Sequence, residues 1–422
     1  MRELKVYINT DLVGLLYEDH DIWSFQYTRE WLNNSNNYAL CSNIPLSGEL
    51  QVDGSSKRYI QWFFDNLLPE EGARTLLARD INVNEADSFG ILAIVGAESA
   101  GAITLSSKSI DTETDKVTEL SFDELNARIA NLPDIPLNNV KSKRMSIAGA
   151  QHKMLVVFNN GKFYEPAGST PSSHILKPEH SKPDLYWQTV RNEWFVMNLA
   201  KSLGFNVPHT SVYYFPAAAY VIERFDRSGI FPEQKRIHAL DGCQALGLSR
   251  SVKYALSNVE QLKQFSEGLR AKGAAKIAIF NWAIFNAIVG NTDAHLKNLS
   301  CLVGSQGAAL SPMYDLICTA IYEEGRGHLN AELSQPMGNA KILAELTRED
   351  IFVFGQVLGL PEKLCATLLD KMLNEIEPHA DHLINYVEEL SDIPHKAGEL
   401  RMLREIRYKL IAEMVNKLKS KA

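Results

Sequence analysis

One segment limits the possible folds of this chain more strongly than any other. Residues 277–290, IAIFNWAIFNAIVG, are apolar on nearly every side of a helix and end on a glycine. A helix without a polar face is buried on all sides in a large core. The loop that follows, GNTDAHLKNLS (residues 290–300), places an Asp, a His, a Lys and an Asn close together. We therefore expect a buried helix that presents a polar loop from a rigid base.

The length and the charge of the chain exclude several classes of protein. A chain of 422 residues is too long for one ordinary core, so we expect two or three domains. The net charge of −8 argues against a protein that binds nucleic acid by itself, although a partner could bind DNA. The N-terminus lacks a signal-peptide pattern, and the apolar runs are shorter than the roughly 18 residues that span a bilayer. These features predict a cytoplasmic protein without membrane contact.

The cysteines indicate neither a disulfide framework nor a metal site. The chain has five of them, an odd number, and none forms a CxxC pair or has zinc-ligand spacing. We expect reduced, structural thiols.

The character of the sequence changes along the chain and predicts an order of domains. Residues 1–105 alternate short strand patterns (KVYI, VGLLY, FQYT) with a helix-like segment. Residues 106–140, which are polar and rich in Ser and Thr, are expected to be a connector. Residues 141–228 contain several strand patterns and one helix, and residues 229–422 have mainly helical periodicity. The order is a small mixed domain, a β-rich lobe and a helical lobe.

Local signals define several elements inside these regions. Asn160-Gly161 separates two short strand runs and predicts a hairpin, because glycine tolerates a positive φ. Residues 59–80 and 183–203 have helical spacing, and Gly204 supplies a stop for the second helix. HILKP, TSVYYF and AYVIERF are typical of strands.

Asp293 and Asn298 have the spacing D-x-x-x-x-N of a protein-kinase catalytic loop. In such a loop the Asp orients or deprotonates the attacking hydroxyl, and the Asn carbonyl holds Mg²⁺. The ordinary alternative is a helix end followed by turn residues, which favour both amino acids. Downstream, LSCLV, GSQG and AALSPMYD predict a hairpin that returns the chain beside this loop and presents Asp315, preceded by Tyr314. Asp315 is thus expected to be the second metal ligand.

The β-rich region contains candidates for nucleotide binding. SIAGAQHK (residues 146–153) has small residues through which backbone N–H groups could reach phosphates, although a plain tight turn is the ordinary alternative. Lys177 on an apolar strand and Glu193 on the next helix could form the ion pair that positions phosphates, or be two exposed charges. ERFDR (residues 223–227) could bind an adenine edge through its backbone. The expected fold class is therefore α+β: a protein-kinase-like two-lobed fold, with a β-rich N-lobe and a helical C-lobe, after a small mixed α/β N-terminal domain.

These residues resemble the HipA family, the serine/threonine kinase toxins of bacterial HipBA toxin–antitoxin systems. The resemblance covers nearly the whole chain and rests on collinear segments: NLLPEEGAR, RMSIAGAQHK, HILKP, NEWFVMNLAKSLGFNVP, VIERFDR, HALDGCQALGLS, GNTDAHLKNLS and SPMYDL. It implies ATP and Mg²⁺ as cofactors, with Asp293 as the catalytic base and Asn298 and Asp315 as metal ligands. It implies autophosphorylation on Ser146. The residues that it assigns to ATP binding are Ala148, Gly149, Ala150, Gln151, His152, Lys153, Lys177, Glu223, Arg224, Phe225, Gln244, His295, Leu296, Lys297, Asn298, Tyr314 and Asp315.

The resemblance also implies partners. Family members bind the helix-turn-helix antitoxin HipB and contact DNA only through that complex, and the best-known member phosphorylates glutamyl-tRNA synthetase, a translation component. ELSQPMG (residues 332–338) departs from the family pattern, so the substrate stays open. Two alternatives stay open as well: a small-molecule phosphotransferase of the aminoglycoside-kinase type, and a catalytically weak scaffold that acts as corepressor with HipB.

Overall fold

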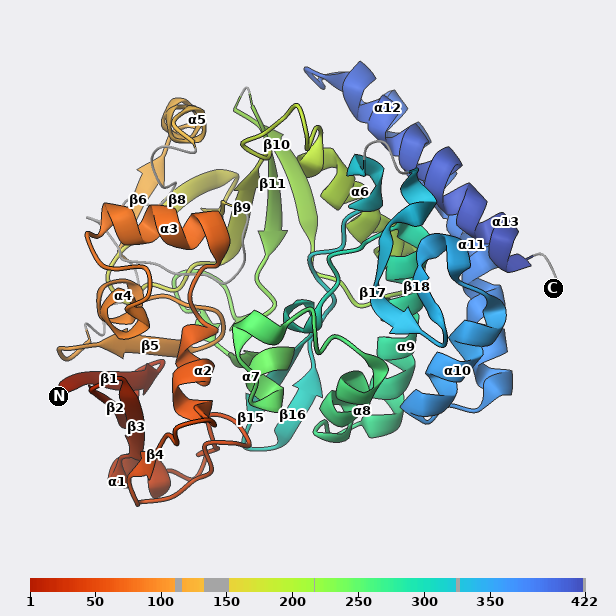
Figure 1. The fold of residues 1–422 in the computed structure, drawn as a ribbon. Helices are drawn as coiled ribbons and strands as arrows, with labels where there is room; N and C mark the ends of the chain where they lie inside the picture. The colour runs from red at the N-terminus through yellow and green to blue at the C-terminus, as the bar shows by residue number, and fades with distance from the viewer. Residues whose placement is uncertain (111–115, 133–151, 216, 324–326, 420–422) are drawn as a thin grey trace. The chain divides into compact units, whose positions relative to one another are not determined.

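The computed structural model describes most of the chain, namely residues 1–110, 116–132, 152–215, 217–323 and 327–419 (Figure 1). The chain forms two compact units, which are considered separately. Unit 1 consists of Met1–Ser181, Val221–Ser251 and Ser300–Ser311. Unit 2 consists of Lys182–Tyr220, Val252–Leu299 and Pro312–Ala422.

The N-terminal part of unit 1 is a five-stranded antiparallel sheet in the order β4-β3-β2-β1-β5 (Figure 1). Its strands are β1 (Arg2–Ile8), β2 (Asp11–Asp19), β3 (Ile22–Tyr27), β4 (Gln51–Val52) and β5 (Ile103–Ser106). Alternating side chains enter the core, so that Leu4, Val6, Leu16 and Phe25 are buried. The strands predicted from KVYI, VGLLY and FQYT are confirmed.

The helical pattern over residues 59–80 corresponds to two helices and not to one. These are α2 (Tyr59–Asp65) and α3 (Glu71–Asp80), with Pro69 between them. Proline has no N–H, and its ring clashes with the carbonyl four residues earlier, so Pro69 disfavours one continuous helix here. The other helices of this part are α1 (Arg29–Leu32) and α4 (Ser88–Val95).

A second sheet of unit 1 has the strand order β11-β9-β7-β8-β6. Its strands are β6 (Val117–Leu120), β7 (Met154–Asn159), β8 (Lys162–Pro166), β9 (His174–Pro178) and β11 (Ala218–Glu223), which enters unit 1 at Val221. The hairpin at Asn160-Gly161 is confirmed, because both residues have a positive φ, 50° and 78°, and join β7 to β8. The strands predicted from HILKP and AYVIERF are confirmed as β9 and β11.

The polar stretch expected to be a connector over residues 106–140 contains regular structure, which corrects that expectation. β6 pairs with β8 as an edge strand, and α5 (Phe122–Ala130) follows it. Leu120 and Leu125 are buried, and the Ser121 side chain accepts a hydrogen bond from the Glu124 N–H at the start of the helix. Two apolar anchors and one cap are therefore enough to order a segment of polar composition.

Unit 1 also holds the hairpin that was predicted after the polar loop. A three-stranded sheet has the order β14-β15-β16, and a two-stranded one pairs β12 with β13. The strands are β12 (Arg227–Ser228), β13 (Lys235–Arg236), β14 (His238–Asp241), β15 (Ser300–Gly304) and β16 (Gly307–Leu310), with α7 (Gly242–Leu246) and η1 (Arg250–Val252) after β14. The Ser311 N–H donates to the Ser300 carbonyl at 2.9 Å and closes the hairpin.

Unit 2 is mainly helical (Figure 1). Its helices are α6 (Thr189–Ser202), α8 (Val259–Glu267), α9 (Lys272–Val289), α10 (Arg348–Leu358), α11 (Glu362–Glu389), α12 (Lys396–Glu405), the π-helical η6 (Ile406–Ile411) and α13 (Ala412–Lys419). Its strands are β10 (Thr210–Tyr214), β17 (Glu332–Met337) and β18 (Ala340–Ile342), and its short 3-10 turns are η2 (Leu296–Asn298), η3 (Ala320–Tyr322), η4 (His328–Asn330) and η5 (Leu343–Glu345).

The apolar helix that opened the sequence argument is α9. It packs against α8, α10, α11 and η6, and its residues from Ile279 on are buried on nearly all sides. The helix predicted from residue 183 begins later, at Thr189, because Gln188 has a left-handed backbone with φ of 54°. Its predicted stop at Gly204, with φ of 86°, is confirmed.

The fold agrees with the predicted α+β class, with β-rich and helical regions. All five cysteines are buried, as expected for structural residues. Within the described ranges no helix combines the length and the apolarity that crossing a membrane requires.

Candidate active site

The loop after α9 is anchored by a chain of amide hydrogen bonds. Gly290 ends the helix with φ of 68°, a left-handed conformation that favours glycine. The Asn291 side chain donates to the Asn286 Oδ1 at 2.8 Å, and the Asn286 Nδ2 donates to the Trp282 carbonyl at 2.9 Å. Asn286 and Asn291 are buried. The base of the loop is therefore rigid, as the sequence predicts.

Asp293 and Asn298 are joined inside this loop. The Asn298 Nδ2 donates to the Asp293 carbonyl at 3.3 Å, and the Asp293 N–H donates to the Asn291 Oδ1 at 3.1 Å. The Asp293 side chain is exposed, whereas Asn298 is buried. Because the Asn298 nitrogen bonds the loop, its Oδ1 is the atom that this orientation offers to a cation. The two residues of the D-x-x-x-x-N pattern are thus joined within one short loop, and the aspartate side chain of this loop is exposed to solvent.

The segment after the β15–β16 hairpin returns beside this loop, as predicted. The Tyr314 hydroxyl donates to the Lys297 carbonyl at 2.7 Å. The next residue, Asp315, has φ of 57°, which is uncommon for a residue with a side chain and is typical of functional sites. The pKa of the buried Tyr220 phenol is raised by burial and, in addition, by the Glu193 and Asp315 carboxylates. The fold of unit 2 therefore brings Glu193 and Asp315 near the Tyr220 side chain.

A second set of hydrogen bonds connects α6 to the Asp315 segment. The Asn192 Nδ2 donates to the Cys318 carbonyl at 2.8 Å, and the Cys318 N–H donates to the Asn192 Oδ1 at 2.9 Å. The Thr292 N–H donates to the Thr319 Oγ1 at 2.6 Å. Hydrogen bonds between side chains and backbone groups therefore join three segments: the Asp293 loop, the segment after Asp315 and the helix that carries Glu193.

The protein oxygens near the Asp293 loop would be enough to hold Mg²⁺ only if substrate phosphates supplied the other ligands. Among the described residues no group of three or more His, Cys, Asp and Glu side chains could cage a metal ion. Mg²⁺ in phosphotransfer sites is held by one or two protein oxygens together with substrate phosphates. The Asn298 amide and the Asp315 carboxylate match this requirement in type. Their fixed loop and the left-handed backbone at Asp315 are consistent with such a role.

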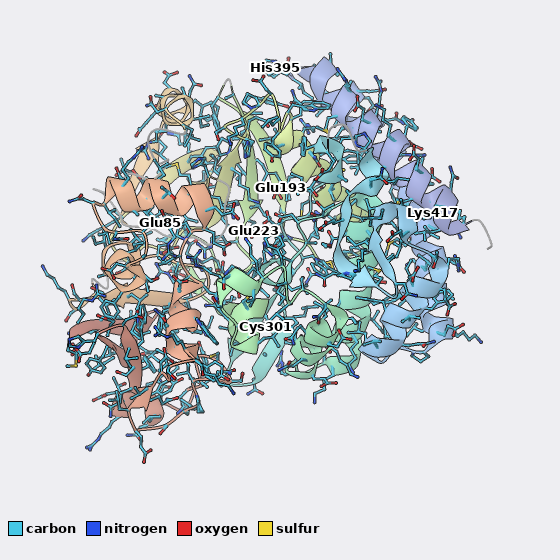
Figure 2. All side chains as sticks on the ribbon, viewed as in Figure 1. Glu85, Glu193, Glu223, Cys301, His395 and Lys417 are labelled. Atoms are coloured by element: carbon cyan, nitrogen blue, oxygen red, sulfur yellow. The ribbon has the colours of Figure 1, made fainter. Side chains whose placement is uncertain are left out.

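Other predicted residues have varied environments. Lys177 is 5% exposed on β9 of unit 1, and Glu193 is 3% exposed on α6 of unit 2. Glu223, which is labelled in Figure 2, ends β11 and is exposed, and Phe225 is half-buried. Of the remaining predicted ATP-binding residues, His295, Leu296 and Lys297 are buried, and His152 and Lys153 are half-buried. Burial lowers the pKa of His152. Ser146, Ala148, Gly149, Ala150 and Gln151 lie outside the described residues.

Two predicted nucleotide ligands have side chains that are occupied within unit 1. The Arg224 guanidinium is buried and donates to the Asp226 carboxylate. The Gln244 side chain donates to the Phe63 carbonyl at 2.9 Å and accepts from the Asp241 N–H at 3.1 Å, in the capping box of α7. If these residues contact nucleotide, the backbone is the more available part of each. Their assignment to the ATP site stays a prediction.

The structure adds residues that sequence reasoning missed. Tyr254 donates to the Asp293 side chain, Asn192 connects to Cys318, and the Gln335 amide donates to the Ala294 carbonyl at 2.8 Å. Asn192 directly precedes Glu193 in the segment NEW, which is the only local signal for it. Tyr254 and Gln335 lie in other segments without a motif, so their roles follow from packing alone.

Comparisons with known proteins agree with this geometry. Residues 4–106 match the HipA N-terminal domain, and residues 145–380 match the HipA-like C-terminal domain. The serine/threonine-protein kinase toxin HipA of Shewanella oneidensis is 30% identical, over 88% of this chain and 87% of that protein. A Sinorhizobium fredii protein that is named as a kinase is 32% identical, over 93% of this chain and 94% of its own length.

A solved structure supports the same relationship over the whole chain. It contains the HipA of Shewanella oneidensis in a complex with HipB and operator DNA. Its TM-score is 0.77 at 27% identity, and the match covers 98% of this chain and 99% of that one. The named relatives place the protein among kinases. The chain belongs to the HipA family.

Proposed function

We propose that the protein is an ATP- and Mg²⁺-dependent serine/threonine protein kinase that acts as the toxin of a toxin–antitoxin system. The observation that carries this proposal is the Asp293–Asn298 loop. Its exposed carboxylate, its inward amide and the returning Asp315 supply a base and two cation ligands from one rigid region. A scaffold without activity would have no physical need for this combination.

Each residue has a defined role in the proposed reaction. Asp293 orients the acceptor hydroxyl and takes its proton while the hydroxyl oxygen bonds to the γ-phosphorus and the bond from that phosphorus to ADP breaks. Asn298 and Asp315 hold Mg²⁺, which, when bound, neutralises charge on the phosphates. Lys177 binds phosphate oxygens. The backbone at Glu223 and Phe225 binds the adenine edge.

The biological partners are proposed from the relatives. The HipA of Shewanella oneidensis was solved with HipB and operator DNA, so we propose a HipB-like antitoxin that connects this protein to DNA. The proposed substrate is a translation component, glutamyl-tRNA synthetase, and the proposed compartment is the cytoplasm. Autophosphorylation of Ser146 would add about −1.5 to −2 charges near the phosphate-binding segment and so turn the kinase off.

The test is a phosphoryl-transfer assay with three acceptors. The protein is incubated with Mg²⁺ and γ-labelled ATP, alone, with purified bacterial glutamyl-tRNA synthetase, or with a bacterial lysate. Labelled serine or threonine that requires Asp293 supports the kinase. Label on the synthetase would identify the substrate, and label on Ser146 the self-modification. Absence of transfer to any acceptor, together with binding of HipB, would instead support the corepressor scaffold.

A further inference from the structure

The carboxylate of Asp293 is held by a residue from another segment of unit 2. The Tyr254 hydroxyl donates a hydrogen bond of 2.6 Å to the Asp293 Oδ1. This distance is typical of an O–H donor on a charged acceptor, which forms a strong hydrogen bond. Both side chains are exposed, and 53% of Tyr254 is accessible. An exposed pair of this kind requires support to keep one geometry.

The structure supplies this support around the Tyr254 ring. The ring packs edge to face on the His295 imidazole, with centroids 4.8 Å apart at 73°. The Lys253 ammonium lies 4.9 Å from the ring centroid, within the range of a cation–π contact. Two faces of Tyr254 are therefore fixed by neighbours, one of which belongs to the catalytic loop itself.

The Gln335 side chain of β17 joins the segment after Tyr254 to the same loop. The Gln335 Nε2 donates to the Ser257 Oγ at 2.5 Å and to the Ala294 carbonyl at 2.8 Å. Gln335 is 1% exposed, so these bonds are shielded from water. The segment 254–257 and the loop that begins at Asp293 therefore keep a constant relation to each other.

We propose that Tyr254 is a positioning residue for phosphoryl transfer. Its hydroxyl holds the Asp293 carboxylate by Oδ1 and so directs Oδ2 toward the acceptor hydroxyl. This inference rests on the proposed role of Asp293 as base. An exposed aspartate samples several rotamers, and a misplacement of about 1 Å can cost on the order of 10² in rate. A single hydroxyl that selects one rotamer is thus expected to matter for kcat and not for nucleotide affinity.

The test removes that hydroxyl and keeps the ring. Tyr254→Phe is expected to lower kcat about tenfold for phosphate transfer from Mg²⁺-ATP, measured as label on the protein and as release of inorganic phosphate. The KM for ATP and the melting temperature stay unchanged. Tyr254→Ala, which also removes the ring contact with His295, is expected to lower kcat at least as much.

A matched control comes from another tyrosine of unit 2. Tyr408 is 57% exposed, and the Arg407 guanidinium lies 4.9 Å from its ring centroid, as Lys253 does at Tyr254. Tyr408→Phe is expected to leave kcat unchanged. A Tyr254→Phe protein with kcat equal to or above that of the wild type, beside an inactive Asp293→Asn protein, would overturn the positioning role alone. Wild-type activity in Asp293→Asn would overturn both this role and the proposed function.

Discussion

Unit 1 and unit 2 each contain a dense group of charged and polar side chains, and the two groups differ in the exposure of their carboxylates to solvent. In unit 1 the charged cluster consists of Glu98, Arg224, Asp226, Arg227 and Arg236. Glu98 is 0% exposed and forms ion pairs with all three arginines. In unit 2 the Asp293 loop keeps an exposed carboxylate and a neighbouring aspartate with a strained backbone.

The pKa values in the charged cluster follow from mutual compensation. Burial alone would raise the pKa of Asp226, but the Arg224 and Arg227 guanidinium groups outweigh it, so that this pKa is lowered. Burial and the repulsion from Arg224 lower the pKa of Arg227 to about 10. The Gly101 N–H adds a hydrogen bond of 2.6 Å to Asp226. The cluster therefore joins the N-terminal part of unit 1 to the end of β11.

The comparison teaches that the density of charge does not identify a functional site. The side chains of the charged cluster are buried and largely neutralise one another, with one surplus positive charge, which fits a structural role. In unit 2 the Asp293 side chain is exposed although Tyr254 donates to it, and Asp315 has a left-handed backbone, which fits a role completed by a ligand. The predictions below test this distinction, beginning with the largest expected effect.

Removal of the Glu98 carboxylate should destabilise unit 1. Glu98→Ala leaves three buried guanidinium groups without their shared partner and is expected to reduce the free energy of unfolding by about 3–5 kcal/mol. Urea unfolding followed by circular dichroism measures the change. The control is Glu119→Ala, which removes an exposed ion pair with Lys162 and should leave stability unchanged. An equal, small effect of both variants would show that the charged cluster is not structural.

Asp293→Asn, in unit 2, should reduce activity and leave stability unchanged, in contrast to Glu98→Ala. The carboxylate is exposed, so the fold and the melting temperature are expected to stay as in the wild type. Loss of the base is expected to reduce phosphoryl transfer by about 10²–10⁴-fold, and binding of ATP should persist. Transfer assays and nucleotide titration give the two readouts. Activity within about tenfold of the wild type would remove Asp293 from the reaction.

Asn192→Ala should affect both stability and activity. The substitution leaves the buried N–H and carbonyl of Cys318 unpaired, at a cost of about 1–3 kcal/mol. Since Cys318 follows Asp315 closely, we expect a higher Mg²⁺ concentration for half-maximal activity. The control is Asn198→Ala on the same helix, which loses bonds to Trp194 and Thr210 and should destabilise without changing the Mg²⁺ requirement. If both variants need the same Mg²⁺ concentration for half-maximal activity, the proposed link between Asn192 and the Asp315 segment is refuted.

A smaller effect concerns the pH dependence of unit 1. Burial, only partly opposed by the hydrogen bond to the Leu40 carbonyl, lowers the pKa of His238 to about 4 from its ordinary 6.5. Between these values the unfolded chain binds a proton that the folded one does not, so stability falls as the pH falls. The expected slope is at most about 1.4 kcal/mol per pH unit and vanishes above pH 6.5. Urea midpoints at pH 7, 6 and 5 measure it, and His238→Gln should flatten the profile.

Local patterns predicted most elements and the centre of the candidate site. The apolar run of α9, the turn at Asn160-Gly161 and the spacing from Asp293 to Asn298 each reflect interactions within a few residues. The same local logic was available for Pro69, which divides one expected helix, and for the cap at Ser121, which begins α5 in an expected connector. Errors of this kind arise when one periodic pattern is given more weight than a breaker or a cap inside it.

The amino-acid sequence by itself therefore determined most of the helices and strands and the spacing of Asp293 and Asn298, because these depend on short-range periodicity and turn chemistry. Only the tertiary structure decided which distant groups meet. Tyr254 reaches Asp293 across 39 residues, and Glu98 reaches Arg224 across 126. Such pairs leave no local pattern, since the packing of whole elements and the need to satisfy buried charges select them.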